Sequence, residues 1–239
     1  MNSTTAEHLI ELTRRFYSEH GRDFSDTRAR LQPGVTQLLG TFQNEADILD
    51  LGCGNGELAR TLSRRGHLGS YLGLDFSLPL LSEAEREAFT FPVKFLKEDL
   101  TAQDWPSLDL KENFDLVFAF AVLHHIPGSD LRLSILEKVH KLLKQEGRFI
   151  HSNWQFLDNP RLKERIQPWE LAGLTPQNVD RNDYLLDWKR GSKGLRYVHH
   201  FDEGELSELA KASHFEIVET FYSDGENKRS GLYQIWKKM

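Results

Sequence analysis

The 239-residue chain has little cysteine and no long apolar run. Its one cysteine, Cys53, excludes an internal disulfide and any metal site built from several cysteines, and we assign no metal ligands. No apolar stretch approaches the length of a membrane span, and the first residues lead into a charged helical pattern, so we expect neither a membrane segment nor a signal peptide.

Positive charge is also in short supply, because 30 Lys and Arg residues stand against 36 Asp and Glu residues, a formal net charge of −6. A protein that grips nucleic acid through its whole surface is normally basic, so any nucleic-acid role would need a local patch. The length suits one large domain, or one domain with an insertion. We therefore expect a soluble, cytoplasmic protein with a single domain spanning residues 1–239.

Strand and helix patterns alternate through the middle of the chain. The sequence predicts strands at residues 48–51, 71–75, 92–96, 115–120 and 147–151, with helices at 56–65, 78–89 and 131–143 between them. The strand at 115–120 is nearly all apolar, as a strand buried on both faces should be. Repeated strand–helix units predict an α/β fold with a parallel sheet and helices on both faces.

The two ends of the chain and one central stretch depart from this alternation. A helix at 8–19, ended by Gly21, and a second at 35–41 predict an N-terminal helical cap over residues 1–45. Residues 46–156 form the expected ligand-binding core, and 157–200 an insertion that serves the substrate, with a hairpin of strands 184–189 and 195–201. Residues 201–239 predict a last helix, 203–212, and two antiparallel strands, 215–222 and 232–236.

Three glycines follow the first core strand, at every second position from Gly52 to Gly56. Glycine lets a ligand touch the main chain, and the helix that follows offers unpaired N–H groups. The spacing differs from the patterns typical of dinucleotide and phosphate loops, and no lysine follows. Asp75 ends the next strand, where a carboxylate accepts hydrogen bonds from ribose, and Asp99 follows the third, where one can receive the amino group of an adenine. With Asp50 they form an acidic rim that favours a cationic nucleoside.

These residues resemble the motifs of class I methyltransferases that use S-adenosyl-L-methionine. Residues 49–56 (LDLGCGNG) are similar to the glycine motif of that family, 114–125 to its fourth-strand motif and 142–148 to the stretch before its fifth strand. The resemblance implies a Rossmann-like fold with a mostly parallel seven-stranded sheet and an antiparallel C-terminal strand. The cofactor-binding residues that it implies are Asp50, Gly52, Cys53, Gly54, Asn55, Gly56, Asp75, Phe76, Ser77, Asp99, Leu100 and Ala119.

A narrower resemblance connects the chain to the tRNA wobble-uridine carboxymethyl methyltransferases. It rests on residues 24–28 (FSDTR), 121–125 (AVLHH) and 195–206 (LRYVHHFDEGEL). It implies O-methylation of a carboxymethyl group on a modified tRNA uridine, and a small zinc-binding activating protein as a partner. It also implies that Arg28 contacts the cofactor's carboxylate, whereas Arg196, Tyr197 and His199 face the substrate.

Further candidates for the substrate site come from the residues themselves. Asn153 and Trp154 follow the fifth core strand, where open α/β sheets place their substrate pockets. His124 is a candidate pocket residue, and Arg196 is the natural clamp for a carboxylate, because guanidinium binds carboxylate through two hydrogen bonds. Side chains alternate along a strand, so either Arg196 or the pair Tyr197 and His199 faces the pocket.

Several alternatives stay open at this point. Trp154 could belong to the core, and Cys53 is better read as a small neighbour of the cofactor than as a nucleophile. A carboxylate acceptor needs no general base, whereas a protonated acceptor would need one such as His124, His199 or His200. The whole protein could instead methylate a small molecule bound by the insertion, or bind the cofactor without catalysis. A nicotinamide-dependent oxidoreductase is the least favoured reading.

Overall fold

The computed structural model describes residues 1–26, 30–106, 110 and 114–188, and 194–239, with side chains omitted for 22–26. Its helices are α1 (Ser3–Asp26), α2 (Pro33–Leu38), α3 (Glu57–Arg64), α4 (Leu78–Ala84), α5 (Ser129–Leu142), α6 (Pro160–Lys163) and α7 (Glu203–Ala212). Short 3₁₀ helices are η1 (Leu123–His125), η2 (Phe156–Asp158) and η3 (Trp169–Ala172). Within these residues, no helix is long and apolar enough to cross a membrane.

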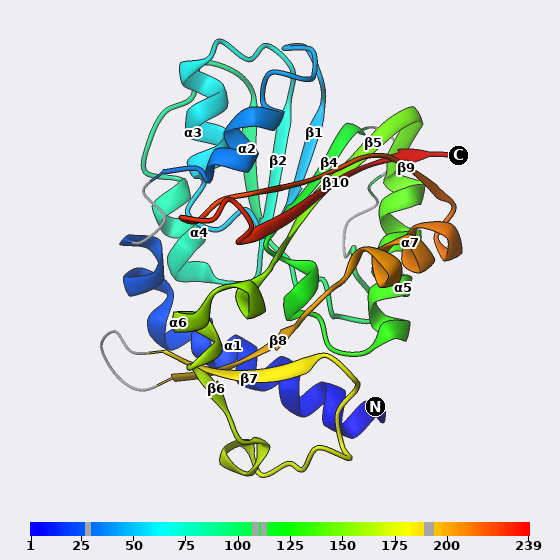
Figure 1. Cartoon of the computed structure of the whole chain (residues 1–239). Coiled ribbons are helices and arrows are strands. Elements are labelled where there is room, and N and C mark those ends of the chain that lie inside the picture. Colours follow the sequence, from blue (N-terminus) through cyan, green and yellow to red (C-terminus); the bar gives the residue numbers. More distant parts are fainter. Residues whose placement is uncertain (27–29, 107–109, 111–113, 189–193) are drawn as a thin grey trace.

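A seven-stranded sheet runs through the centre of the molecule in the order β3-β2-β1-β4-β5-β10-β9 (Figure 1). Its strands are β1 (Ile48–Leu51), β2 (Tyr71–Asp75), β3 (Val93–Lys97), β4 (Phe114–Phe120), β5 (Leu143–Trp154), β9 (Phe215–Ser223) and β10 (Gly231–Lys238). β1 to β5 pair in parallel, whereas β10 is antiparallel to both β5 and β9. The predicted sheet, mostly parallel with an antiparallel C-terminal strand, is confirmed.

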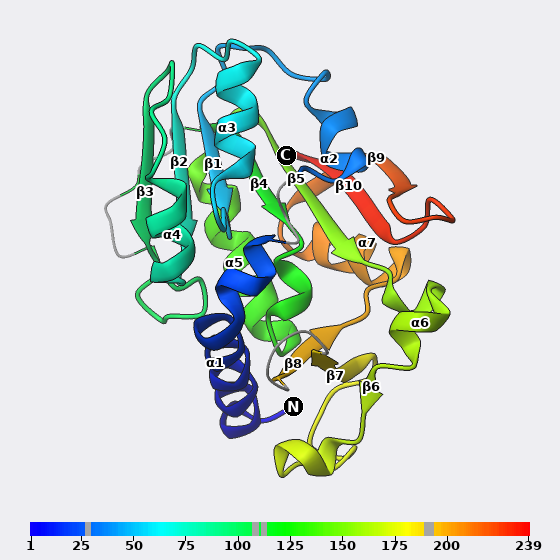
Figure 2. The same cartoon turned by 90° about the vertical axis from the view of Figure 1, so that its left-hand side faces the viewer.

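Helices cover both faces of this sheet, and each face has its own apolar core (Figures 1 and 2). On one face α2, α3 and α4 contribute Val35, Leu58 and Leu81 to a cluster with β1 and β4. On the other, α5 and α7 contribute Leu136 and Leu206. Strands buried on both faces explain why the sequence between 48 and 120 carries apolar runs rather than an alternation.

The expected insertion forms a second, antiparallel sheet of three strands in the order β6-β7-β8. Its strands are β6 (Ile166–Gln167), β7 (Asp183–Trp188) and β8 (Gly194–His199), and the β7–β8 pair is the predicted hairpin. Figure 2 shows this sheet beside α1, beyond the end of the large sheet where β1 and β4 terminate. Helix α1 packs on β8 and on α4, so it contacts both the small sheet and a helix that covers the large one.

Some predicted boundaries were wrong. Gly21 does not end the first helix, which continues to Asp26; a Cβ at Gly21 would lie 3.5 Å from Ser77 Oγ, so the glycine sits where α1 meets the start of α4. The helix predicted at 78–89 ends at Ala84. β5 is longer than predicted because it pairs with β4 along one edge and with β10 along the other.

Candidate functional site

The glycine turn after β1 has a conformation that other residues adopt with difficulty. Gly52, Gly54 and Gly56 have φ of 71°, 55° and 78°, in the left-handed region, and Gly56 is the N-cap of α3. A Cβ on Gly52 would lie 2.5 Å from Val122 Cγ2, whereas one on Gly54 would meet nothing within 4 Å. Gly52 is therefore needed for close packing, and Gly54 leaves its main chain open to the space beside it.

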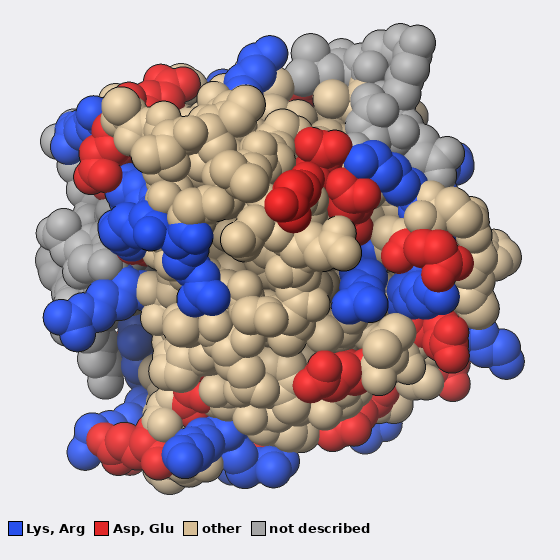
Figure 3. All heavy atoms as spheres, turned by 90° about the horizontal axis from the view of Figure 1, so that it is seen from above, with Lys and Arg blue, Asp and Glu red and all other residues tan. Residues whose placement is uncertain are grey.

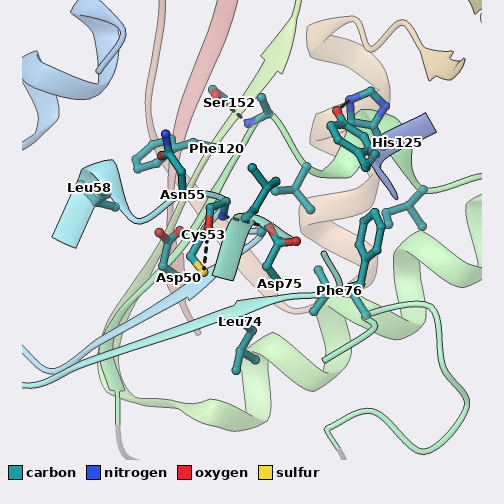
Figure 4. Close-up of a pocket in the computed structure, with 18 of the residues that line it drawn as sticks. Asp50, Cys53, Asn55, Leu58, Leu74, Asp75, Phe76, Phe120, His125 and Ser152 are labelled. Carbon is teal, nitrogen blue, oxygen red and sulfur yellow. Dashed lines mark hydrogen bonds between the residues drawn. The ribbon is translucent and has the colours of Figure 1, made fainter. Parts of the chain in front are cut away.

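That space is a cavity of about 240 Å³, hereafter the first cavity, shown in Figure 4. Nine of the predicted cofactor residues line it, namely Asp50, Gly52, Cys53, Gly54, Asn55, Asp75, Phe76, Asp99 and Leu100. Three others do not line it: Gly56 caps α3, Ser77 precedes α4, and Ala119 is fully buried in β4. Arg28 lies outside the described residues.

Two buried carboxylates stand on either side of Cys53 in this cavity (Figure 4). Asp50 Oδ2 accepts a hydrogen bond from the Tyr71 hydroxyl at 2.5 Å, and Asp75 accepts from the Gly54 N–H at 2.9 Å and the Ser77 N–H at 2.8 Å. Burial raises the pKa of Asp50 to about 7, an increase that the Tyr71 hydrogen bond opposes and the charge of Asp75 supports. Burial likewise raises the pKa of Asp75 to about 6 against its backbone hydrogen bonds. Both carboxylates would be stabilised in their charged form by a cationic ligand.

The environment of Cys53 argues against a nucleophilic role. Burial raises the pKa of its thiol well above the usual value, and the negative charges of Asp75 and Asp50 raise it further. The thiolate is the nucleophilic form of cysteine, so this site suppresses it. Cys53 is therefore a small wall residue, in agreement with the sequence-based interpretation.

Asp99 has a partner that the sequence did not predict. Arg14 of α1 donates to Asp99 Oδ2 through Nε, at 2.7 Å, and through Nη2, while Thr101 donates its N–H (2.9 Å) and hydroxyl (2.6 Å) to Oδ1. Both oxygens of the predicted adenine-binding carboxylate are thus hydrogen-bonded within the protein. An adenine amino group would have to share Asp99 with Arg14 or displace it.

A second cavity of about 140 Å³ adjoins the first. Four predicted substrate-site residues line it: His124, Asn153, Trp154 and Arg196. Six residues line both cavities, namely Tyr17, Gln32, Ala121, His125, Ser152 and Tyr233. The two cavities are therefore contiguous, as a donor site and an acceptor site of a transfer reaction must be.

Arg196 reaches the second cavity from β8 through a group of aromatic rings. Its guanidinium carbon lies 4.8 Å from the ring centre of Trp154, 5.3 Å from that of Phe16 and 5.8 Å from that of Trp188. The side chain is only 4% exposed. Cation–π contacts of this kind fix the plane of a guanidinium and so its two hydrogen-bonding edges.

Tyr197 and His199 line neither cavity, so they do not share the predicted substrate site with Arg196. The Tyr197 hydroxyl donates to Asp183 Oδ1 at 2.6 Å, and His199 Nδ1 lies 2.7 Å from the same oxygen. These residues alternate with Arg196 along β8 and therefore point to its opposite face. The prediction that Tyr197 and His199 face the substrate was therefore wrong.

None of the six residues on the wall that the cavities share was among the predicted site residues, and two of them, Tyr17 and His125, contact each other. Tyr17 belongs to the apolar face of α1, where its spacing indicated only a core position, and His125 is the neighbour of the predicted His124. The Tyr17 hydroxyl lies 3.0 Å from His125 Nε2, and His125 Nδ1 lies 3.0 Å from the Tyr197 carbonyl oxygen. Because a carbonyl only accepts, His125 Nδ1 carries the hydrogen, and in the neutral ring Nε2 accepts from Tyr17.

His124 and Asn153 both have hydrogen-bonding partners beside the second cavity. The Trp154 N–H donates to His124 Nδ1 at 3.3 Å, and the Asn153 amide lies 3.1 Å from His151 Nδ1.

Across the part of the chain that is described, no group of three or more His, Cys, Asp or Glu side chains is arranged to hold a metal ion.

Known proteins resemble the chain over different lengths. Residues 49–149 match the family described as "Methyltransferase domain". A protein of Encephalitozoon cuniculi, provisionally named as a methyltransferase, is 30% identical over 94% of each chain. The tRNA (carboxymethyluridine(34)-5-O)-methyltransferase of Schizosaccharomyces pombe is 24% identical over 90% of this chain and 93% of its own. The ubiquinone biosynthesis O-methyltransferase of Alkalilimnicola ehrlichii is 31% identical over 68% of each.

Solved structures share the fold. The crystal structure of a SAM-dependent methyltransferase from Methanosarcina mazei has a TM-score of 0.66 and 20% identity, covering 87% of this chain and 98% of that one. At this identity the likeness concerns the arrangement of strands and helices.

Proposed function

The chain belongs to the methyltransferases, and on this premise we propose that it transfers a methyl group from S-adenosyl-L-methionine to a carboxymethyl group on a tRNA wobble uridine. The enzyme class predicted from the sequence is confirmed. The predicted cofactor is the one that the names of the solved neighbours carry. The proposal concerns which residues hold that cofactor and what accepts the methyl group.

The first cavity fits S-adenosyl-L-methionine by charge and shape. The buried Asp50 and Asp75 suit a ligand with a sulfonium and an ammonium group and disfavour phosphates. Gly54 exposes main chain to the cavity, so the methionine part of the cofactor can lie against it. Asp75 is the ribose ligand of the proposal, and Asp99, Leu100 and Phe76 line the adenine end.

The observation that carries the acceptor assignment is the buried Arg196 on the wall of the second cavity. A guanidinium fixed between aromatic rings can bind one carboxylate through two parallel hydrogen bonds. Trp154, whose ring carries the Arg196 guanidinium on one side, lines the same cavity and could contact a pyrimidine ring bound beside that guanidinium. A uridine that carries a carboxymethyl group combines both features.

The residues of the chain then act chiefly by orientation. When bound, S-adenosyl-L-methionine supplies a methyl carbon that its sulfonium sulfur activates toward displacement. Arg196 would hold the acceptor carboxylate, whose oxygen attacks without losing a proton, so no general base is required. Tyr17 and His125, on the wall common to both cavities, would separate the reacting atoms from water. Alignment of this kind contributes about 7 to 11 kcal/mol in favourable cases.

The charge distribution limits where a tRNA could bind. Figure 3 shows basic and acidic side chains mixed over the face at the top of Figure 1, on the far side from α1. We place the tRNA on the side of α1 and the three-stranded sheet, where the second cavity lies. Cytoplasmic location and a small zinc-binding activating partner complete the proposal.

Transfer of labelled methyl from the cofactor into separated RNA, protein and metabolite fractions tests the proposal. We expect label in tRNA, released as methanol by mild alkali because it is held as an ester. Label in RNA that resists alkali would contradict the carboxylate acceptor. The assay should be run with the purified chain and after adding cell extract, so that a required partner is supplied.

A small-molecule acceptor is the second candidate. The likeness to the ubiquinone biosynthesis O-methyltransferase favours it, as does the net charge of −6. Saturable label in the metabolite fraction without RNA would establish it. Cofactor binding with no label in any fraction would favour a non-catalytic protein.

A further inference from the structure

Strand β8 presents two different faces to the rest of the molecule. Arg196 lies on the face toward the second cavity, and its neighbours Tyr197 and His199 lie on the other. Because the three positions share one short strand, whatever fixes the face of Tyr197 and His199 also fixes the direction of Arg196.

Asp183 of β7 lies at the centre of the contacts that Tyr197 and His199 make. Its Oδ1 accepts from the Tyr197 hydroxyl at 2.6 Å and from His199 Nδ1 at 2.7 Å, and its Oδ2 accepts from the Asp180 N–H at 2.9 Å. The Asp183 side chain has no exposed surface. Three donors therefore replace the water that an ionised carboxylate requires.

Asp183 belongs to a chain of ionisable side chains that continues through His199. His199 Nε2 lies 2.9 Å from both oxygens of Glu205, and Arg132 Nη2 lies 3.7 Å from Glu205 Oε1. His199 therefore bridges two carboxyl groups, Asp183 at Nδ1 and Glu205 at Nε2. Asp183, His199, Glu205 and Arg132 thus form one connected set, and removing Asp183 leaves the buried His199 and Tyr197 without a hydrogen-bonding partner that each has in the fold.

This set is connected to both cavities through Tyr197. The Tyr197 carbonyl accepts from His125 Nδ1 at 3.0 Å, and His125 lines both cavities. The adjacent residue is Arg196. A shift of β8 would therefore move the guanidinium and the shared wall together.

We infer that Asp183 is a positioning residue for the acceptor site, holding β8 so that the Arg196 guanidinium faces the second cavity. The role of Arg196 as a clamp rests on the proposed function; its placement by Asp183 does not. Asp183 touches neither cavity, so it acts only through β8 and, by way of the Tyr197 carbonyl, through His125.

The first test observes Arg196 without any substrate. In the ¹⁵N-labelled, deuterated full chain, we expect the surrounding rings to shift the Arg196 Nε–H signal, which is identified by its loss in Arg196→Lys. We expect Asp183→Asn and Tyr197→Phe to move this signal toward the value of an exposed arginine. Tyr184→Phe is the matched control, since it removes a hydroxyl from the same hairpin outside the set, and it should leave the signal in place.

The second test measures kinetics with tRNA. We expect Tyr197→Phe and Asp183→Asn to lower kcat/KM for tRNA by about tenfold to a hundredfold, and to change the Kd for the cofactor much less, because the set reaches the first cavity only through His125. In the Arg196→Lys background each change should lower kcat/KM much less than in the wild type, whereas general destabilisation would add in full.

An unmoved Arg196 signal in folded Asp183→Asn and Tyr197→Phe would overturn the inference. If Asp183→Asn does not fold, Tyr197→Phe decides alone. Absence of tRNA methylation by the wild-type chain would refute the proposed function while the NMR result still decides the role of Asp183.

Discussion

Acidification should weaken cofactor binding, because the first cavity holds two carboxylates that the ligand needs in their charged form. The pKa of Asp50 is raised to about 7 and that of Asp75 to about 6. A ligand with a sulfonium and an ammonium group stabilises the ionised forms, so binding releases protons below these values. Affinity should therefore fall as the pH decreases from about 8 to 5.5.

The size of the effect follows from the two pKa values. At about pH 5.5, ionising a carboxyl group of pKa about 7 costs about 2 kcal/mol, which corresponds to about a 30-fold loss of affinity. Asp75, with a pKa of about 6, adds a factor of about four. The dissociation constant should thus increase by about a hundredfold if both groups must ionise.

Isothermal titration calorimetry with S-adenosyl-L-methionine measures both quantities. Titrations in buffers with different ionisation enthalpies give the number of protons released, which should approach two at about pH 5.5 and vanish at about pH 8. Asp50→Asn should bind more weakly at high pH and show a much flatter profile. Asp104→Asn, which changes an exposed carboxylate outside the cavity, should keep the full pH dependence.

A dissociation constant that stays constant over this pH range, without proton release, would refute the reasoning. It would mean that the cofactor's charges do not interact with Asp50 and Asp75. Binding that tightens on acidification would refute it more strongly, since the sign itself would be wrong.

Four further substitutions should separate the roles of individual residues. Gly52→Ala should lower the free energy of unfolding by about 2 to 4 kcal/mol in thermal unfolding, because the new methyl group displaces Val122 and strains the left-handed backbone, whereas Gly54→Ala should keep most of the stability and lose cofactor affinity in the same titration. Arg14→Ala should raise the cofactor association rate in stopped-flow fluorescence, because it frees an oxygen of Asp99; an unchanged rate would show that Arg14 need not move. Burial lowers the pKa of His151 to about 3, so on acidification the unfolded chain takes up a proton at this histidine before the folded chain does. The contribution of the neutral ring to stability is therefore present above pH 6.5 and lost as the pH falls. Relative to His151→Phe, the wild type should lose about 2 to 3 kcal/mol of unfolding free energy between about pH 6.5 and 4.5.

The sheet and the glycine turn could be predicted because their signals are local. β1 is a short apolar run that leads directly into Gly52, Gly54 and Gly56, and the main-chain conformation there depends on those residues alone. The parallel direction of the strands followed from the alternation of strands and helices, since each helix returns the chain to the end of the sheet at which the previous strand began.

The second cavity was harder to predict, because its residues come from distant segments. Arg196, Tyr197 and His199 form a strand whose two faces are both buried, so alternation alone could not decide which face meets the substrate. Arg14 and Asp99, which contact each other, lie 85 positions apart in the chain, and local sequence patterns cannot predict such a contact. Tyr17 shares a helical face with core residues, and only the packing of α1 against both cavities distinguishes it.

Mass spectrometry of tRNA nucleosides tests the central claim most directly. tRNA from cells in which the gene for this chain is deleted would be incubated with the chain, S-adenosyl-L-methionine and extract of the same cells, then digested. The account predicts that the carboxymethyl nucleoside is converted to its methyl ester, and that Arg196→Lys greatly reduces this conversion. A carboxymethyl nucleoside that remains unesterified would contradict the proposed acceptor.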